Sequence, residues 1–341
     1  MLRCPHLAEQ ILQKLDNEGL AKSREVQRCW QKFIDERDYP WLRIVNIPNV
    51  LPKGNTYLHL VAEYGQIDVF EMLLNEENNT DQKNNLDETP FMFACRKGRM
   101  NIVAMLLKKS GELKIDLNQK DCCDVTAFSY SVENGHSKIA KMIMDNSLQL
   151  KIDLNTKDIK DTTPFHFVGQ YGHSEIAEMM INNSSKLKID LCSLDNEECT
   201  ALHLACHNGH LEVAEMILEN SSRLKMDLNR RDIGGYTAFH LACVLGHQKI
   251  AEMIMNHSSC LKIEFNTPCN NGMTIFHSAC KGRQSDNRTK LVKIIIEWSE
   301  RHKIDLTAKD KYGRNGYHIA ESFKNTEVIN LIKTKMPGLV M

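Results

Sequence analysis

A short pattern that starts with threonine recurs through most of this 341-residue chain. Its clearest copy runs from Thr200 to Leu218 and reads Thr-Ala-Leu-His-Leu-Ala-Cys-His-Asn-Gly-His, followed by an apolar-rich stretch. The first position of the pattern falls at Thr56, Thr89, Thr126, Thr163, Thr200, Thr237, Thr274 and Asn315, at successive distances of 33, 37, 37, 37, 37, 37 and 41 residues. A fixed period of this size predicts a solenoid of stacked supersecondary units.

The residue types within one copy predict two short helices. Thr200 can cap the first helix, since its hydroxyl accepts from the free amides of the first turn. Leu202 and Ala205 lie three apart on one helical face, and Gly209 can take the left-handed conformation that ends a helix. Residues 213–218 supply the apolar stripe of a second helix. Neither helix can bury its stripe alone, so each pair must stack on its neighbours.

The hexapeptides that start at Thr200 and Thr237, together with Gly-His pairs such as Gly209-His210, resemble ankyrin repeats. The resemblance covers residues 53–335 and implies an all-α solenoid of about eight repeats, with residues 336–341 as a tail. These repeats start near residues 53, 84, 121, 158, 195, 232, 269 and 310. The family implies two antiparallel helices and a projecting hairpin per repeat, a concave face that binds protein partners, and no catalysis.

Most repeats here are four residues longer than the ~33-residue ankyrin unit. Comparing residues 184–191 with residues 221–228 places the extra residues after the second helix. We expect them to lengthen that helix by about one turn, either as a spacer or as part of a binding site. In repeat 7, Gly282 to Lys290 carries four further residues between the helices, and this loop is expected to project.

Composition limits the partners and the compartment. With 43 basic and 44 acidic residues, no net field recruits nucleic acid or an anionic membrane. No run is apolar enough to span a bilayer or to serve as a signal peptide. The basic residues Arg96, Lys97 and Arg99 lack interleaved aromatics and are interpreted as a solvated face.

Twelve cysteines do not form a disulfide or zinc pattern. Cys95, Cys206, Cys243 and Cys280 recur six residues after the repeat threonine, where a small buried side chain is expected. Reduced cysteines favour the cytoplasm or nucleus. The histidines of the Thr-x-Leu-His element are interpreted as structural, and no motif for an enzyme, cofactor or metal site is present.

Residues 1–45 have a different pattern, which predicts a small helical unit. They resemble an F-box, the module by which substrate receptors dock on the Skp1 adaptor of cullin-RING ubiquitin ligases. The positions that carry this resemblance, and that would bind the adaptor, are Pro5, Ile11, Leu12, Leu15, Leu20, Val26 and Trp30. Cys4 departs from the leucine usual there. The alternative is a helical cap of the solenoid, and residues 46–52 form a linker in either case.

The concave face is the expected site for a target protein. In ankyrin arrays it includes side chains just before the repeat threonine and just before the helix-ending glycine. The apolar residues at those places are Ile159, Tyr171, Ile233, Tyr236, Val244 and Leu245. They are candidate partner-binding residues, unless they contact the adjoining repeats. The sequence thus predicts a non-enzymatic substrate-recognition subunit of a ubiquitin ligase, or a scaffold with no role in ubiquitination.

Overall fold

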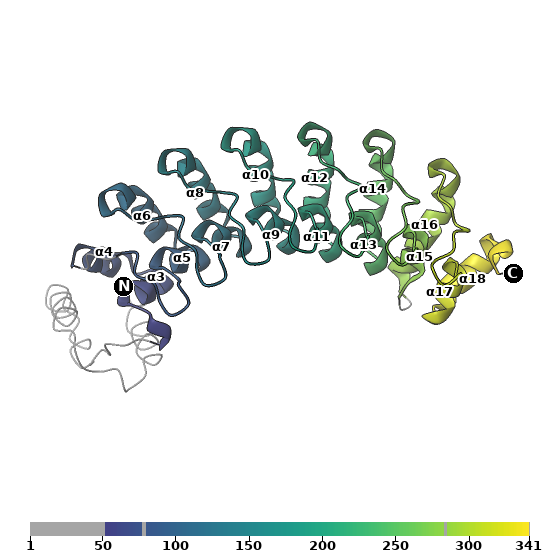
Figure 1. The fold of residues 1–341 in the computed structure, drawn as a ribbon, viewed down its shortest axis with the longest axis horizontal. Coiled ribbons are helices and arrows are strands. Elements are labelled where there is room, and N and C mark those ends of the chain that lie inside the picture. The colour runs from purple at the N-terminus through teal and green to yellow at the C-terminus, as the bar shows by residue number, and fades with distance from the viewer. Residues whose placement is uncertain (1–51, 77–79, 283–284, 341) are drawn as a thin grey trace, which may run out of the picture. The chain divides into compact units, whose positions relative to one another are not determined.

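The computed structural model describes residues 52–76, 80–282 and 285–340 (Figure 1). The predicted F-box-like unit at residues 1–45 lies outside these residues, as does the linker apart from Pro52. The chain divides into two compact units, the first ending at Ile159 and the second starting at Lys160. The described parts are all-helical and contain no strand beyond an isolated bridge between Lys120 and Thr126.

Both units consist of helix pairs. The first unit contains η2 (Pro52–Gly54), α3 (Tyr57–Tyr64), α4 (Ile67–Glu76), α5 (Pro90–Arg96), α6 (Met100–Leu113), α7 (Ala127–Glu133) and α8 (Ser137–Leu150). The second unit contains α9 (Pro164–Tyr171), α10 (Ser174–Leu187), α11 (Ala201–Asn208), α12 (Leu211–Leu224), α13 (Ala238–Leu245), α14 (Gln248–Leu261), α15 (Ile275–Cys280), α16 (Asp286–His302), α17 (Gly316–Ser322), α18 (Thr326–Lys335) and η3 (Pro337–Leu339).

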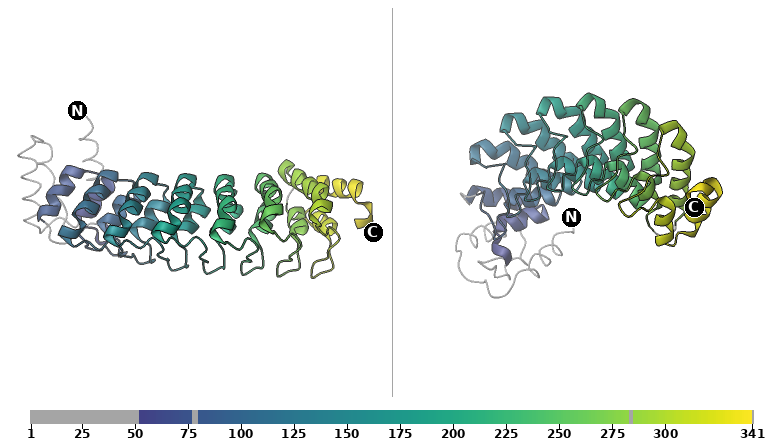
Figure 2. Two further views of the ribbon diagram at one scale, coloured as in Figure 1. Left: turned by 90° about the horizontal axis from the view of Figure 1, so that it is seen from above. Right: turned by 45° about the vertical axis from the view of Figure 1, so that its right-hand side comes forward.

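Each unit has two helical layers. In the first unit α5 packs between α3 and α7, while the longer α6 packs between α4 and α8. In the second unit α11 and α12 take the corresponding places between their neighbours. Loops between consecutive pairs project on one side of the helices in each unit (Figure 2). As predicted, the extra residues prolong the second helix, since α12 extends to Leu224.

In the repeats that carry both residues, threonine and histidine together fix the start of the first helix. Thr200 Oγ1 accepts from the backbone N–H of His203, and the N–H of Thr200 donates to His203 Nδ1. Because Nδ1 accepts this bond, the ring proton sits on Nε2, which lies 3.1 Å from the Arg230 carbonyl oxygen. Nε2 of His59, His166 and His277 also bonds to the following hairpin, at the carbonyl of the residue directly before the next repeat threonine or Asn315. In these four repeats the histidine is therefore structural, and it ties its repeat to the hairpin that follows.

The glycine that ends the first helix also allows a contact between neighbouring repeats. Gly209 has φ of 81°, and a Cβ there would lie 2.7 Å from the His247 ring. That ring occupies the space and donates through Nε2 to the His207 carbonyl oxygen at 3.0 Å. His210 makes the equivalent bond to Gln170. Glycine is required both for its backbone conformation and to admit the imidazole of the next repeat.

In repeat 7 an arginine replaces this histidine, and the part of the predicted loop from Asp286 to Lys290 is helical instead of projecting. Helix α16 already begins at Asp286, so most of the extra residues are helical. Arg288, on its first turn, is only 7% exposed. Its Nη2 donates to the Val244 carbonyl at 2.8 Å, while Nη1 donates to Ala279 at 3.0 Å and Cys243 at 3.4 Å. The insertion thus brings a cation to the carbonyl ends of α13 and α15, where the helix dipole favours positive charge.

Candidate protein-binding surface

Several hairpin tips are held in place by an acidic side chain at the base. Asp121 Oδ1 accepts from the N–H groups of Cys123 and Val125, each at 2.8 Å, and Asp124 takes the left-handed conformation. Asp195 and Asp310 bond in the same way to the amides two and four residues ahead. Such local bonds define a turn without help from the tip side chains. The two residues after the base are therefore displayed rather than packed.

Backbone hydrogen bonds connect successive tips within each unit. In the first unit the N–H of Cys122 donates to the Leu86 carbonyl at 2.9 Å, and that of Ile159 to Cys123 at 3.1 Å. In the second unit Ile233 bonds to Glu197 at 3.0 Å, and the next two tips continue the series. Each unit thus presents an ordered row of tips at a spacing set by the repeat.

Most of the predicted partner-binding residues are exposed. Ile159 is 62% exposed on a tip of the first unit. In the second unit Ile233 is 60% exposed on a tip, while Tyr171 and Leu245, at the ends of α9 and α13, are each 42% exposed. Solvating such side chains is unfavourable, so exposed groups of this kind are candidate binding residues.

Two predicted residues are partly used by the fold. Tyr236 is half-buried, and its ring lies 6.0 Å from that of His240. Burial, together with the Cys269 thiol of the next hairpin beside its hydroxyl, raises the pKa of Tyr236 to about 12. Val244 is half-buried as well, and its carbonyl oxygen accepts from Arg288. For Tyr236, the contact with an adjoining repeat that the sequence left open is present; for Val244, the bond to the next repeat comes from the backbone carbonyl.

A model of the family "Ankyrin repeats (3 copies)" matches overlapping segments of the sequence. The segments are residues 40–121, 58–158, 146–232, 185–264 and 222–310. The chain belongs to the ankyrin-repeat family. Ankyrin repeats are generally non-catalytic modules that bind protein partners.

Among curated proteins, alpha-latroinsectotoxin-Lt1a from Latrodectus tredecimguttatus is similar to part of the chain. The two are 35% identical over 80 residues, which make up 24% of this chain and 6% of the toxin. The similarity thus spans a small fraction of that protein's length. It concerns a stretch of about two repeats.

Several exposed residues of the ankyrin array were missed by the sequence reasoning. Tyr312, on the tip of repeat 8, is 73% exposed. Leu86 and Phe323 are exposed on a tip and after α17, respectively. Tyr312 follows directly after Lys311, which corresponds to Ile233, so attention to both tip positions would have found it. Only the position four before the repeat threonine was considered at the tips.

The basic cluster in repeat 2 is not a solvated face, contrary to the prediction. Arg96 pairs with the buried Glu88 carboxylate, and its guanidinium lies 4.5 Å from the centre of the Phe93 ring. Arg99 Nε donates to the Glu63 carbonyl oxygen at 2.7 Å. The planar guanidinium suits both roles. Arg96 and Arg99 therefore support the repeat stack.

The cysteines of the ankyrin array are free thiols wherever the structure describes them. Burial raises the pKa of Cys95, Cys206, Cys243 and Cys280, so these thiols stay protonated. Within the described ranges, no three histidine, cysteine or acidic side chains converge as a metal site would require. Nor does any described helix have the length and apolarity needed to cross a membrane.

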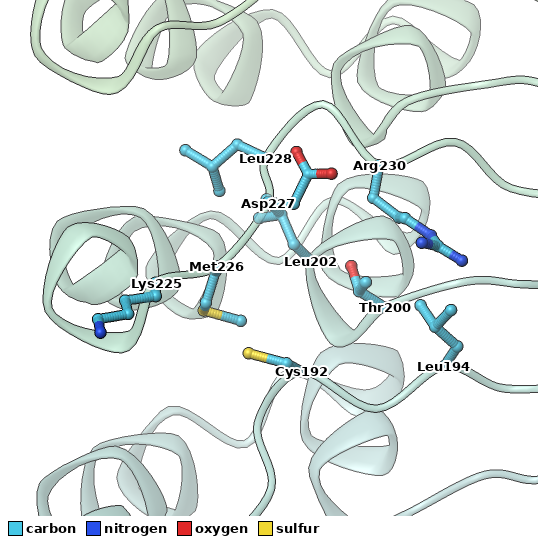
Figure 3. Close-up of a pocket in the computed structure, with 9 residues that line it drawn as sticks. All are labelled: Cys192, Leu194, Thr200, Leu202, Lys225, Met226, Asp227, Leu228 and Arg230. Carbon is cyan, nitrogen blue, oxygen red and sulfur yellow. The ribbon is translucent and has the colours of Figure 1, made fainter.

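A cavity of about 200 Å³ opens between two loops of the second unit (Figure 3). Cys192 and Leu194 come from one loop and residues 225–228 from the next, while Thr200, Leu202 and Arg230 complete the lining. Met226 and Leu228 are half-buried there. The residues at the position of Leu228 in other repeats are buried, namely Leu117, Leu154, Leu191, Phe265 and Leu306, whereas Ile263, at the position of Met226, is half-buried as well. The packing between the loops is incomplete at this junction.

Proposed function

We propose that the ankyrin array binds a target protein through its hairpin tips and the ends of its first helices. The observation that carries this proposal is the exposure of the Ile159, Ile233 and Leu245 side chains, on turns and helices whose hydrogen bonds come from the backbone, together with the exposed Tyr171 ring. Exposed apolar and aromatic side chains on a rigid support supply buried contact area at low entropic cost.

Changing Ile233 and Leu245 together to serine tests the array surface. Because both side chains are exposed, the free energy of unfolding should change by no more than about 0.5 kcal/mol per site. Capture of target proteins, measured by affinity purification and mass spectrometry, should fall. Leu148→Ser is the matched control, since Leu148 is 62% exposed in α8, away from the tips. Identical captured sets for all three proteins would contradict this surface.

We further propose that the chain is the substrate-recognition subunit of a cullin-RING ubiquitin ligase, acting in the cytoplasm or nucleus. The F-box-like pattern in residues 1–45 supports this role, with Ile11, Leu12 and Leu15 on the expected adaptor-binding helix. The alternative is an ankyrin scaffold in which the same residues cap the array. A receptor needs both an adaptor-binding unit and a target-binding array, and this order of patterns fits that requirement.

A triple change of Ile11, Leu12 and Leu15 to alanine separates these roles. If the residues bind Skp1, co-purification with the adaptor should be lost, while the melting temperature of the array stays unchanged. Equal recovery of Skp1 with wild type and variant would rule out docking through this helix. A lower melting temperature would instead favour the cap.

A further inference from the structure

Asparagine side chains form a series of bridges between neighbouring loops. In the first unit Asn118 Nδ2 donates to the Lys151 carbonyl at 2.9 Å, and its Oδ1 accepts from the Asp153 N–H at 2.8 Å. One carboxamide thus satisfies a carbonyl and an amide that lie two residues apart on the next loop. The carbonyl belongs to a lysine in the left-handed conformation, directly after the second helix.

The second unit repeats this bridge twice. Asn229 bonds to Lys262 and Glu264 at 3.0 and 2.8 Å. Asn266 bonds to Lys303 and Asp305, both at 2.8 Å. The lysine carbonyl and the N–H group two residues later are therefore placed alike in these loops, and a primary carboxamide bonds to both.

Cys192 interrupts the series. It lies 37 residues before Asn229, at the same repeat position, and its thiol reaches only to 4.0 Å from the Leu224 carbonyl. Among the residues that the structure describes, no side chain bonds to the Lys225 carbonyl or the Asp227 N–H. Both residues line the cavity, with Met226 between them (Figure 3).

We propose that this cavity binds the carboxamide side chain of an asparagine or glutamine from a protein partner. The ligand oxygen accepts from the Asp227 N–H, and the ligand NH₂ donates to the Lys225 carbonyl, as the asparagines do elsewhere. The apolar part of the side chain covers Met226 and Leu228, which the fold leaves half-buried. The statement that the carboxamide comes from a protein partner rests on the proposed protein-binding function; the affinity of the cavity for a carboxamide does not.

A carboxylate meets only half of the requirement. In repeat 2 the corresponding residue is Asp81, whose Oδ2 accepts from the Asp116 N–H at 2.7 Å. A carboxylate has no proton for the lysine carbonyl and places a negative charge beside it. Glutamine should therefore bind in preference to glutamate.

The test uses the full chain and butyramide, which reproduces a glutamine side chain, with butyrate as the carboxylate control. Titration should shift the backbone amide resonance of Asp227 saturably with butyramide, in the millimolar range expected for so small a ligand. Butyrate should shift it at least several-fold less at equal concentration. No saturable shift with butyramide, or an equal response to butyrate, would overturn the proposal.

Two substitutions sharpen the result. Cys192→Asn supplies the missing bridge from within, so it should abolish the butyramide shift and raise the melting temperature by about 2–4 °C. Cys192→Ser leaves the backbone pair free and should respond to butyramide like wild type. Binding to the Asn variant that equals wild type would refute the site. The butyramide titration needs no protein partner, so it tests the cavity by itself. A failure to capture target proteins would instead count against the proposed function.

Discussion

Replacing Arg288 with alanine is expected to lower the free energy of unfolding by about 3 kcal/mol. A hydrogen bond to a charged group contributes about 1.5–3 kcal/mol, and Arg288 makes two bonds of 3.0 Å or shorter and a third at 3.4 Å. Burial lowers the pKa of this guanidinium, so desolvation offsets part of the gain. Urea denaturation measures the total change. Hydrogen exchange should place it in α13, α15 and α16.

Two control variants show which property of Arg288 stabilises the fold. Arg288→Met keeps an apolar stem but removes every donor, so it should be nearly as unstable as the alanine variant. Arg288→Lys keeps the charge but loses the planar fork, and its stability should be intermediate. If the alanine variant unfolds within about 0.5 kcal/mol of wild type, the arginine does not couple these repeats.

Acidification from pH 7 to pH 5 is the second change with a large expected effect. Burial lowers the pKa of His59, His203 and His277, and burial together with the charge of Arg231 lowers that of His240 to about 4. The unfolded chain, with histidine pKa values near 6.5, therefore binds more protons than the folded chain. The contribution of these neutral histidines to the free energy of unfolding is fully present above about pH 6.5. It is lost as the pH falls toward the pKa values of the folded state.

The size of the stability loss follows from the pKa shift of His240. One pKa unit corresponds to 1.36 kcal/mol, so His240 alone accounts for a loss on the order of 3 kcal/mol between about pH 6.5 and pH 4. Its Nδ1 accepts the Thr237 N–H at 3.3 Å, and a proton there sets donor against donor. Urea midpoints measured at pH 7, 6 and 5 should fall in sequence.

His240→Gln is the control for this assignment. The variant should be less stable than wild type at pH 7, yet its stability should change less on acidification, because one titrating group is gone. Carboxyl groups have ordinary pKa values near 4, so they titrate mostly below about pH 5 and contribute less to this window than histidine. A wild-type midpoint that stays constant from pH 7 to pH 5 would show that the buried histidines do not control stability.

The helix pairs and their order followed from the sequence because the signals are local and repeated. Thr200, His203 and Gly209 each act within a few residues, and the period shows where they recur. Arg288 could not be predicted in this way. It replaces a histidine from a different place in its repeat, and only the packing of α16 shows that it reaches Val244.

The candidate surface was predictable where exposure follows from repeat position, as at Ile159 and Ile233. It was less predictable for Tyr236, because a long side chain can reach the next hairpin from an exposed position. The cavity at Cys192 does have a signal in the sequence. Asparagine recurs at residues 118, 155, 229 and 266, and cysteine breaks this series once.

The acidic residue at the base of hairpins such as those at Asp121 and Asp195 has an evolutionary consequence. Because Asp121 or Asp195 holds its loop through main-chain amides, substitutions at the two tip positions leave the fold intact. Each tip is then an independent locus on which selection can act, and duplication of a repeat adds another. Such a chain can change its recognition repertoire by small steps, without passing through unstable ancestors.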